Sequence, residues 1–350
     1  MRFVALLLLV ALALAPAGKL CADSQPLWTN PLVEQRADGF VYRHTDGYYY
    51  FMATVPNWDY LELRRATTLD GLRDAEPKTI WNRHPSGPMG GFIWAPEIHF
   101  IGGKWFIYFG AGTSEDNWKI RLYVLENDSD NPLEGDWNEK GQIDTGMDSF
   151  ALDPTTFEQD GQQYLVWAQK DPKMKSDVHS NIYIAKMDTP WSISGSAVML
   201  STPKYPWECV RCKVNEGPEV LQKNGKIFIT YSASGIGSEY CLGLLTADAK
   251  ADLLDPQSWV KSPVPVFKSS PENSQYGPGH NAFTSLPDGT DVMMYHDRNY
   301  EVKGDPLNDK NRHERAQIVN WKADGTPDFG VPVPDGPYSP GVPAPSSGNK

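Results

Sequence analysis

Long hydrophobic runs are absent from this chain after its first residues. The apolar block Phe3–Ala15 follows an arginine and leads into small residues, the pattern of a secretory signal peptide over residues 1–22. Cleavage is expected after Ala17 or Ala22; a lipid-modified Cys21 is the alternative, although Gly-Lys-Leu is a poor lipobox. No later stretch reaches the roughly 18 apolar residues of a membrane span. We therefore expect a secreted, extracellular protein with no membrane partner.

The chain also lacks an excess of positive charge. It carries 44 acidic and 32 basic residues, a formal net charge of −12. This balance argues against nucleic acid and anionic membrane surfaces as partners, because both are bound through basic patches. An uncharged substrate fits better. Aromatic residues make up 12% of the chain, and they suit both strand interiors and stacking against sugar rings.

Cysteine is scarce, with four residues in 350. A structural zinc site takes four ligands, normally from two Cys-x-x-Cys pairs, and this chain has one such pair, Cys209 and Cys212. A thioredoxin-like role would need a βαβ pattern that is missing here. For a secreted chain, the remaining interpretation is a small disulfide between Cys209 and Cys212. The other covalent modification that the sequence suggests is glycosylation at Asn127, in a segment expected to be a loop.

Long helical periodicity is missing as well, and short aromatic and β-branched runs take its place. Each run follows a two-residue turn of the kind that favours a β-hairpin. The turns are Asp46-Gly47, Gly102-Gly103, Asp160-Gly161, Asn224-Gly225 and Asp288-Gly289. The runs are Tyr48–Thr54, Trp105–Gly110, Tyr164–Ala168, Ile227–Ser232 and Val292–His296. The sequence therefore predicts five hairpins.

These hairpins recur at a nearly constant period. Their turn glycines lie 56, 58, 64 and 64 residues apart, and a period near 60 with several strands per unit indicates a radial β-propeller. We expect an all-β fold, a five-bladed β-propeller with four-stranded antiparallel blades, over residues 23–336. Residues 337–350, rich in proline, serine and glycine, are expected to form a separate tail. We expect a monomer.

The same period predicts where functional residues meet. Counting back nine residues from the turn glycine reaches Asp38, Trp94, Glu216 and His280, and counting back eight reaches Asp153. These residues are expected at equivalent places at the start of each first strand, and first strands line the axis of a propeller. A single aspartate of this kind is more often a turn or cap residue. Three carboxylates in register with a five-fold repeat predict a site.

Blocks around these positions resemble the signature motifs of glycoside hydrolase family 43. The matching blocks are Arg36-Ala37-Asp38, Trp94-Ala95-Pro96-Glu97, Leu152-Asp153, Val214-Asn215-Glu216-Gly217-Pro218 and Gly277-Pro278-Gly279-His280-Asn281. The longer matches are most similar to the family's exo-acting α-1,5-L-arabinofuranosidases; they are Val214–Pro218, Tyr276–Asn281 and Asp305–His313. The resemblance implies a five-bladed propeller and an inverting hydrolase that releases L-arabinofuranose from arabinan or arabino-oligosaccharides.

Inverting glycoside hydrolysis needs a protonated acid at the leaving oxygen and an ionised base that activates water on the opposite face, with roughly 6.5–9.5 Å between the two carboxyl groups. Glu216 is assigned as the general acid, because its longer side chain reaches the glycosidic oxygen. Asp38 is assigned as the general base. Asp153 is expected between them, where its charge raises the pKa of the acid and orients it. No cofactor is required.

Four further residues are expected to bind the substrate or an ion. Trp94 and Phe40 would form an aromatic wall against the arabinose ring, with propeller core as the alternative. Arg298 matches an arginine that the family uses near sugar hydroxyls, with a surface salt bridge as the alternative. His280 matches an axial histidine that holds water or a structural calcium ion in related members. Gly39 stands where the family commonly has proline, which leaves the rigidity of this loop in question.

Two other classes of function stay open. A non-catalytic sugar-binding propeller would keep Trp94 and Phe40 but tolerate the loss of a carboxylate. A β-xylosidase or an endo-arabinanase of the same fold would keep all three carboxylates and differ in the rim loops, such as Pro56–Tyr60 and Lys170–His179. The products released from linear arabinan and from xylan would distinguish these possibilities.

Overall fold

The computed structural model describes residues 25–340, and the signal peptide expected over residues 1–22 lies outside the described residues. Strands account for nearly all regular structure. Within the described range, helix occurs only as short 3₁₀ turns: η1 (Asp70–Leu72), η2 (Pro206–Glu208), η3 (Pro256–Ser258) and η4 (Pro271–Asn273). None of these turns is long and apolar enough to cross a membrane. The expected all-β class is confirmed.

The first two sheets each hold four antiparallel strands in chain order. The first sheet contains β2 (Ala37–Arg43), β3 (Tyr49–Thr54), β4 (Tyr60–Ala66) and β5 (Lys78–Asn82). The second contains β6 (Pro88–Ile101), β7 (Lys104–Thr113), β8 (Arg121–Asn127) and β9 (Asn138–Gln142). Each strand pairs with the next along the chain, as the repeat predicts.

The middle of the chain forms a nine-stranded sheet in two antiparallel parts. One part contains β10 (Ala151–Gln159), β11 (Gln162–Gln169), β12 (Val178–Thr189) and β13 (Ser192–Ser201). The other contains β14 (Lys213–Lys223), β15 (Lys226–Ala233), β16 (Cys241–Asp248), β17 (Val260–Lys261) and β18 (Phe267–Lys268). A short parallel contact between β12 and β14 joins the two parts.

The last sheet has three strands rather than the four that the repeat predicts. It contains β19 (Tyr276–Ser285), β20 (Asp291–Arg298) and β21 (His313–Ile318), followed by a separate pair, β22 (Asn320–Trp321) and β23 (Pro327–Asp328). The two ends of the described chain, β1 (Trp28–Asn30) and β24 (Gly336–Tyr338), pair with each other. The domain boundary expected after residue 336 therefore needs correction, because β24 runs across it and Tyr338 stacks on Trp28 with ring centroids 4.9 Å apart.

The five predicted hairpins all form, with a left-handed glycine at each turn. The φ angles of these glycines lie between 72° and 88°, a conformation that glycine adopts without steric cost. Three of the turns have two loop residues. The first and last turns have three, because the N–H groups of His44 and Leu286 donate to the carbonyl oxygens of Tyr48 and Thr290 at 2.9 and 2.8 Å.

A β-bulge interrupts the first strand of every hairpin. The positions of these bulges show that the five predicted site residues are not all structurally equivalent. The first bulge residue has φ between 43° and 57° in each strand; these residues are Asp38, Ala95, Asp153, Gly217 and His280. Trp94 and Glu216 therefore come one position earlier than predicted. Counting back from the turn errs by one residue because the turns differ in length.

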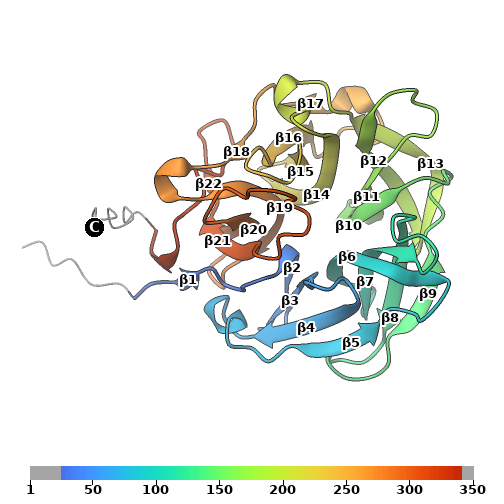
Figure 1. The fold of residues 1–350 in the computed structure, drawn as a ribbon, viewed down its shortest axis with the longest axis horizontal. Coiled ribbons are helices and arrows are strands. Elements are labelled where there is room, and N and C mark those ends of the chain that lie inside the picture. The colour runs from blue at the N-terminus through green and yellow to red at the C-terminus, as the bar shows by residue number, and fades with distance from the viewer. Residues whose placement is uncertain (1–24, 341–350) are drawn as a thin grey trace, which may run out of the picture.

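The first strands β2, β6, β10, β14 and β19 lie around the centre of the molecule (Figure 1). Each contacts the next, and β19 contacts β2. Buried hydrophobic clusters fill the spaces between consecutive groups of strands. A further cluster joins the two ends of the chain, where Trp28, Val41 and Phe51 pack with Val292 and Met294. Because these clusters supply the packing of the inner strands, the inner strands can present polar residues toward the centre.

Candidate active site

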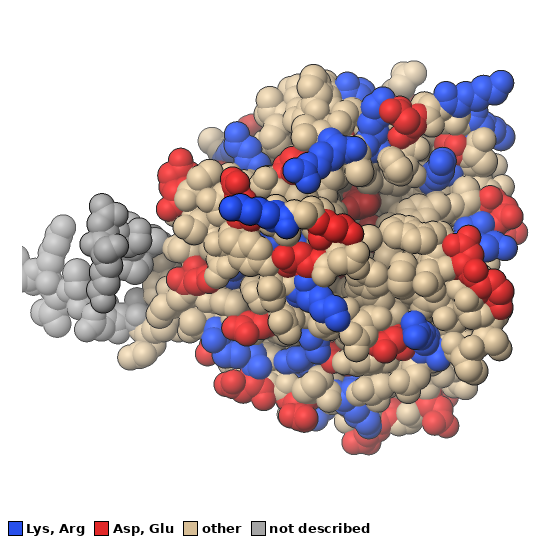
Figure 2. All heavy atoms as spheres, in the orientation of Figure 1, with Lys and Arg blue, Asp and Glu red and all other residues tan. Residues whose placement is uncertain are grey.

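A cavity of about 390 Å³ opens where the first strands meet. Five of the residues predicted from sequence line it, one from each first strand: Asp38, Trp94, Asp153, Glu216 and His280. Figure 2 shows a hollow near the centre of this face, with acidic atoms inside it. Side chains from distant parts of the chain thus meet in one cavity.

Asp38 occupies the bulge of β2, and its neighbours fix the direction of its carboxylate. The N–H of Asp38 donates to Nδ1 of His296 at 3.0 Å. Thr54 Oγ1 donates to Oδ2 at 2.8 Å, and a guanidinium nitrogen of Arg312 donates to Oδ1 at 3.2 Å. Each carboxylate oxygen therefore has its own donor.

The same neighbours keep Asp38 ionised. Burial alone would raise its pKa, but the charge of Arg312, helped by His280, His296 and Thr54, outweighs burial and holds the pKa of Asp38 well below its usual range. The His280 ring contributes from close by, with Nδ1 3.3 Å from Oδ1 of Asp38. Asp38 is therefore a proton acceptor far into the acidic range.

Glu216, on β14, is held in the opposite state. Burial and, to a smaller extent, the charge of Asp38 raise the pKa of Glu216 to about 7, against a hydrogen bond from Tyr240 and the charge of Arg312. Tyr240 Oη donates to Oε1 of Glu216 at 2.8 Å. Below neutral pH the Glu216 carboxyl group holds a proton that it can give to a bound molecule.

Asp153, on β10, connects the two halves of the nine-stranded sheet beside the site. Its Oδ2 accepts the N–H of Gly217 at 2.8 Å, and Gly217 directly follows Glu216. Burial raises the pKa of Asp153 well above its ordinary value, as do the charges of Glu216 and Asp38, against the Gly217 N–H. Asp153 therefore holds the backbone that carries Glu216. The charges that act on the pKa of Glu216 are those of Asp38 and Arg312, which corrects the expected effect of the Asp153 charge.

Sequence reasoning misses two polar residues of the site. Arg312 lines the cavity and pairs with Asp38, and it is 8% exposed. Its only signal is its place in the block Asp305–His313. Tyr240 precedes β16 and shows no signal of its own in the sequence, because its partner Glu216 lies two strands away.

Trp94 lies in an aromatic group at the edge of the cavity. Its ring stacks on Phe92 with centroids 5.4 Å apart and meets Trp118 edge-on at 5.4 Å. Trp118 also lines the cavity and is 52% exposed. Exposed aromatic faces beside polar groups are suited to binding a sugar ring.

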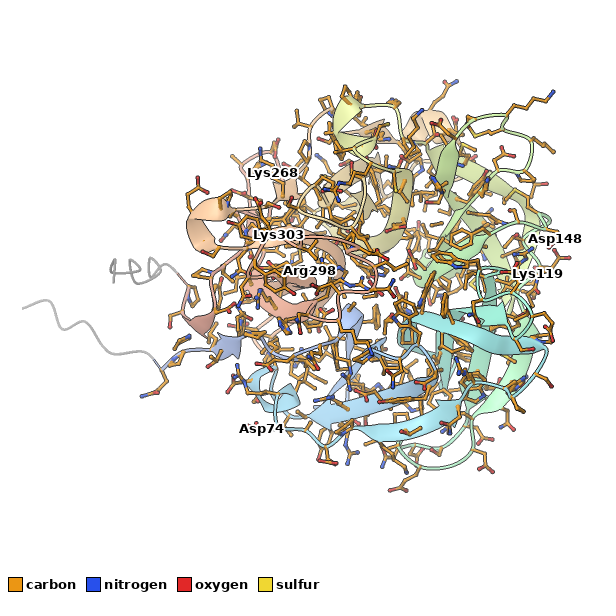
Figure 3. The ribbon with its side chains drawn as sticks, in the orientation of Figure 1. Asp74, Lys119, Asp148, Lys268, Arg298 and Lys303 are labelled. Atoms are coloured by element: carbon orange, nitrogen blue, oxygen red, sulfur yellow. The ribbon has the colours of Figure 1, made fainter. Side chains whose placement is uncertain are left out.

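Phe40 and Arg298 do not line the cavity, which corrects both expected binding roles. After the bulge, Phe40 pairs with Met52 and packs in the core against His99, with ring centroids 4.7 Å apart. Arg298 ends β20 and is 1% exposed. It donates to the carbonyl oxygens of Ile236 at 3.1 Å and Pro306 at 2.7 Å. Figure 3 shows Arg298 over the β19–β21 sheet, and these hydrogen bonds brace the loops that carry the two carbonyl groups.

His280 lines the cavity but does not belong to a metal-binding cluster. Its N–H donates to Ser232 Oγ at 2.7 Å, and burial lowers the pKa of the ring, against the charge of Asp38. Among residues 25–340, no three His, Cys, Asp or Glu side chains are placed to hold one ion. Calcium takes six to eight oxygen ligands. The His280 ring offers a nitrogen atom, so His280 does not fit as a direct ligand of a calcium ion.

Cys209 and Cys212 are free thiols, which corrects the expected disulfide. Arg211 between them adopts φ 63°, and the Cys212 N–H donates to the carbonyl of Val210 at 2.8 Å. This tight turn directs the two side chains into different surroundings. Cys212 lines the cavity, and Cys209 does not.

Asn127 is fully buried at the end of β8, so glycosylation there is incompatible with the folded protein. Its Nδ2 donates to the carbonyl of Glu134 at 2.7 Å, and its Oδ1 accepts the N–H of Ser129 at 2.8 Å. The asparagine therefore serves as a turn residue, with no free amide nitrogen for a glycan.

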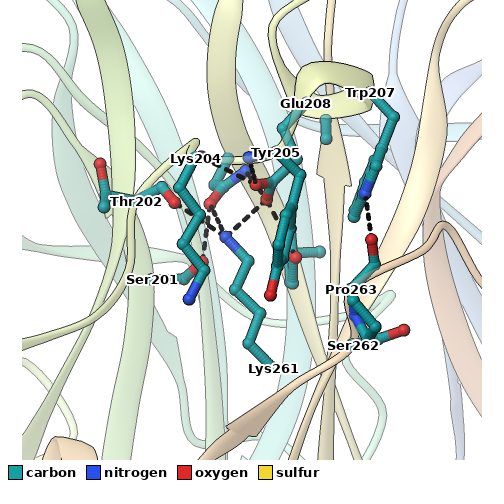
Figure 4. Close-up of polar contacts among 12 residues, drawn as sticks. Ser201, Thr202, Lys204, Tyr205, Trp207, Glu208, Lys261, Ser262 and Pro263 are labelled. Carbon is teal, nitrogen blue, oxygen red and sulfur yellow. Dashed lines mark hydrogen bonds and ion pairs between the residues drawn. The ribbon is translucent and has the colours of Figure 1, made fainter.

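A buried ion pair anchors the chain just before Glu216. Lys261 Nζ lies 2.6 Å from Oε1 of Glu208, and the two side chains are 8% and 0% exposed. Glu208 Oε1 also accepts from Asn215 Nδ2 at 3.0 Å and from Tyr231 Oη at 3.0 Å. Figure 4 shows Lys261 extended toward Glu208 beneath η2. Because Asn215 directly precedes Glu216, this network positions the start of β14.

An all-β fold that brings one ionised and one protonated carboxyl group to an aromatic-edged cavity has the chemistry that a glycosidase needs. Residues 28–327 match the family model described as Glycosyl hydrolases family 43, and the chain belongs to this family. The resemblance inferred from the motifs is confirmed.

Individual relatives are close. The chain is 56% identical over 335 residues to an extracellular exo-α-(1→5)-L-arabinofuranosidase of Streptomyces avermitilis, covering 94% of this chain and 69% of that protein. It is 50% identical over 298 residues to a protein of the same name from Streptomyces chartreusis, covering 85% and 90% respectively. Among solved structures, an α-L-arabinofuranosidase from Lactobacillus brevis matches with a TM-score of 0.85 and 52% identity, covering 88% of this chain and 98% of that chain.

Proposed function

We propose that this chain is a secreted, extracellular exo-α-1,5-L-arabinofuranosidase that inverts the anomeric configuration of its substrate. It would release single L-arabinofuranose units from arabinan or arabino-oligosaccharides. The observation that carries the proposal is the opposed protonation of Asp38 and Glu216 in one cavity. Relatives that are half or more identical to the chain bear the same activity in their names.

In the proposed reaction, Glu216 donates its proton to the glycosidic oxygen as the bond from that oxygen to the anomeric carbon breaks. Asp38 takes a proton from water as the water oxygen bonds to the same carbon on the opposite face. Glu216 ends ionised and Asp38 protonated, and solvent returns both to their starting states. Asp153 holds Glu216 in place through the Gly217 N–H, and Trp94 faces the sugar ring. No step uses calcium.

We also propose that the antiparallel groups are five blades of a closed β-propeller. The contacts from each first strand to the next, including β19 to β2, support closure. The parallel β12–β14 pairing would then be a local join between two blades. The catalytic domain would take in residues 23–336 and the rest of β24. A monomer would suffice, since one chain supplies every residue of the proposed reaction.

The function is tested by following products from linear α-1,5-arabinan and from xylan over time by chromatography. Arabinose as the only early product of arabinan is the expected result. Early di- or trisaccharides would mean endo action and contradict the exo assignment. Xylose released faster than arabinose would identify a β-xylosidase instead.

A further inference from the structure

The bulge that carries Asp38 presents two successive N–H groups to side chains rather than to strand β3. Asp38 N–H donates to Nδ1 of His296 at 3.0 Å, and Gly39 N–H donates to Oε1 of Glu314 at 2.9 Å. His296 and Glu314 are directly paired across β20 and β21. One cross-strand pair therefore supplies both acceptors for the bulge.

Glu314 is rigidly placed and out of contact with solvent. Its residue is 0% exposed, its N–H donates to the carbonyl of Val33 at 2.9 Å, and its carbonyl accepts from Leu32 N–H at 2.7 Å. Oε2 has no hydrogen-bond partner among residues 25–340. An ionised carboxylate with an unpaired oxygen in such a place costs far more free energy than the neutral acid does.

Glu314 does not take part in the proposed reaction, although it lies beside the base. Burial raises its pKa well above the ordinary value, against the Gly39 N–H. The charged groups that face it are Asp38 from β2, Asp297 from β20 and Arg312 before β21. As a neutral acid, Glu314 accepts the Gly39 N–H without placing a second negative charge beside Asp38.

Residue 39 must meet two requirements at once. It must supply an N–H to Glu314, which proline cannot do. It must also lack a side chain, because a Cβ atom at position 39 would lie 2.5 Å from Cδ and 2.7 Å from Oε1 of Glu314. Glycine meets both conditions with Glu314 in its observed position. The hydrogen bond restrains this bulge in place of the proline ring that the family resemblance leads one to expect.

We propose that Glu314 is a positioning residue for the general base: by holding the Gly39 N–H it aims the Asp38 carboxylate into the cavity, with Gly39 as its matched partner. The inference rests on the proposed role of Asp38. Under this proposal Glu314 and Gly39 position the general base, although neither residue takes part in the reaction itself.

The first test compares Glu314→Met with Glu314→Gln on arabino-oligosaccharides. Methionine has a similar size but gives the Gly39 N–H no good acceptor, so kcat should fall roughly 10- to 100-fold, the cost of a misplaced catalytic group, with KM changed less than about twofold. Glutamine keeps an acceptor oxygen and no charge. It should restore kcat to within about threefold of the parent and leave the acid limb of the pH–rate profile in place.

Gln317→Met is the matched control for a general loss of packing. Gln317 lies on the same strand, β21, is 4% exposed, and its side-chain oxygen accepts from Tyr295 Oη at 3.0 Å. This variant should lower the melting temperature but keep kcat at 25 °C. Equal loss of kcat in Gln317→Met and Glu314→Met would reduce Glu314 to a purely structural residue and overturn the proposal.

A double-mutant cycle tests the matched pair. Gly39→Ala should lower kcat, because its Cβ collides with Glu314. In Gly39→Ala/Glu314→Ala the smaller residue 314 leaves room, so the double variant should be no slower than Glu314→Ala alone. The proposal would be overturned if the kcat losses of Gly39→Ala and Glu314→Ala multiplied in the double variant, or if Glu314→Met kept the parent kcat. In either case Asp38→Asn would still be crippled, which leaves the base assignment intact. Near-normal activity of Asp38→Asn would instead overturn the base assignment, and this proposal with it.

Discussion

At the scale of single residues, two carboxyl groups of similar chemistry are driven to opposite protonation states by their neighbours. Both are buried, and burial raises the pKa of each. Asp38 has the Arg312 charge beside it, and this charge, helped by His280, His296 and Thr54, more than cancels the effect of burial. Glu216 has one neutral hydroxyl donor, Tyr240, and the charges of Asp38 and Arg312 act on it in opposite directions. A division between acid and base therefore follows from the surroundings rather than from residue type.

Replacing each carboxyl group should reveal its role. Glu216→Gln removes the proton donor, so activity on arabinan should fall roughly 10²–10⁴-fold, while a nitrophenyl arabinoside, whose leaving group needs little protonation, should lose far less. Asp38→Asn removes the group that activates water and should be crippled on both substrates, with partial rescue by azide. Equal losses for Glu216→Gln on both substrates, measured by initial rates, would contradict the assignment.

The pH–rate profile should depend on Tyr240. Activity needs Glu216 protonated, so kcat/KM should fall as the pH rises through about 7, the value to which burial raises the Glu216 pKa. The Tyr240 hydroxyl stabilises the ionised carboxylate and thereby lowers this pKa. Tyr240→Phe should therefore move the alkaline limb to higher pH and leave the acid limb unchanged. A move to lower pH would show that Tyr240 stabilises the protonated form instead.

At the scale of elements, the strands that carry the site are held by buried polar side chains at their starts. The bulge of β2 is held by His296 and Glu314, and the start of β14 is held through Asn215 by Glu208 and Lys261. Bulged backbone cannot complete a regular ladder, so its N–H groups need other acceptors. Side chains therefore satisfy the backbone groups that the strand pairing leaves without partners.

Breaking the Glu208–Lys261 pair should be costly. Lys261→Met leaves the Glu208 carboxylate buried without its counter-charge, and the free energy of unfolding should fall by about 3–5 kcal/mol, measured by urea denaturation. Lys213→Met removes an ion pair to Asp177 whose side chains are 41% and 72% exposed, and it should leave stability unchanged within error. Similar effects for the two variants would mean that the buried pair is better hydrated than its exposure indicates.

At the scale of the whole molecule, the two ends of the described chain close on each other. Strands β1 and β24 pair, the Trp28 ring stacks on Tyr338, and a shared cluster of buried side chains lies beneath them. The Tyr338 hydroxyl also accepts the N–H of Ile318 at 3.1 Å. Pro337 and Tyr338, which the composition assigns to the tail, thus belong to the folded unit.

Tyr338 should contribute measurably to stability. Tyr338→Phe keeps the stack on Trp28 but leaves the Ile318 N–H without its acceptor, which should cost about 1 kcal/mol. Tyr338→Ala also loses the stacked ring and should cost about 2 kcal/mol or more. Thermal unfolding should therefore rank the parent above Tyr338→Phe, and Tyr338→Phe above Tyr338→Ala. A Tyr338→Ala variant as stable as the parent would contradict the closure by β24.

The sequence by itself determined what depends on neighbours along the chain. Turn glycines such as Gly47 and Gly225, with an aromatic and β-branched run after each, specify hairpins because turn geometry and strand pairing are local. Their regular period led to the inner strands and so to Asp38, Asp153 and Glu216. The family followed from blocks of adjacent residues around the same strands.

Only the tertiary structure decided what depends on contacts between distant segments. A one-residue difference in turn length moved Glu216 out of register with Asp38, and a bulge turned Phe40 into the core. Arg312 reaches Asp38 from the other end of the chain. Arg298 donates its hydrogen bonds to loop carbonyl groups instead of to the cavity. The distinct states of Asp38 and Glu216 arise in the same way, because burial and charge are properties of the assembled cavity and not of any stretch of sequence.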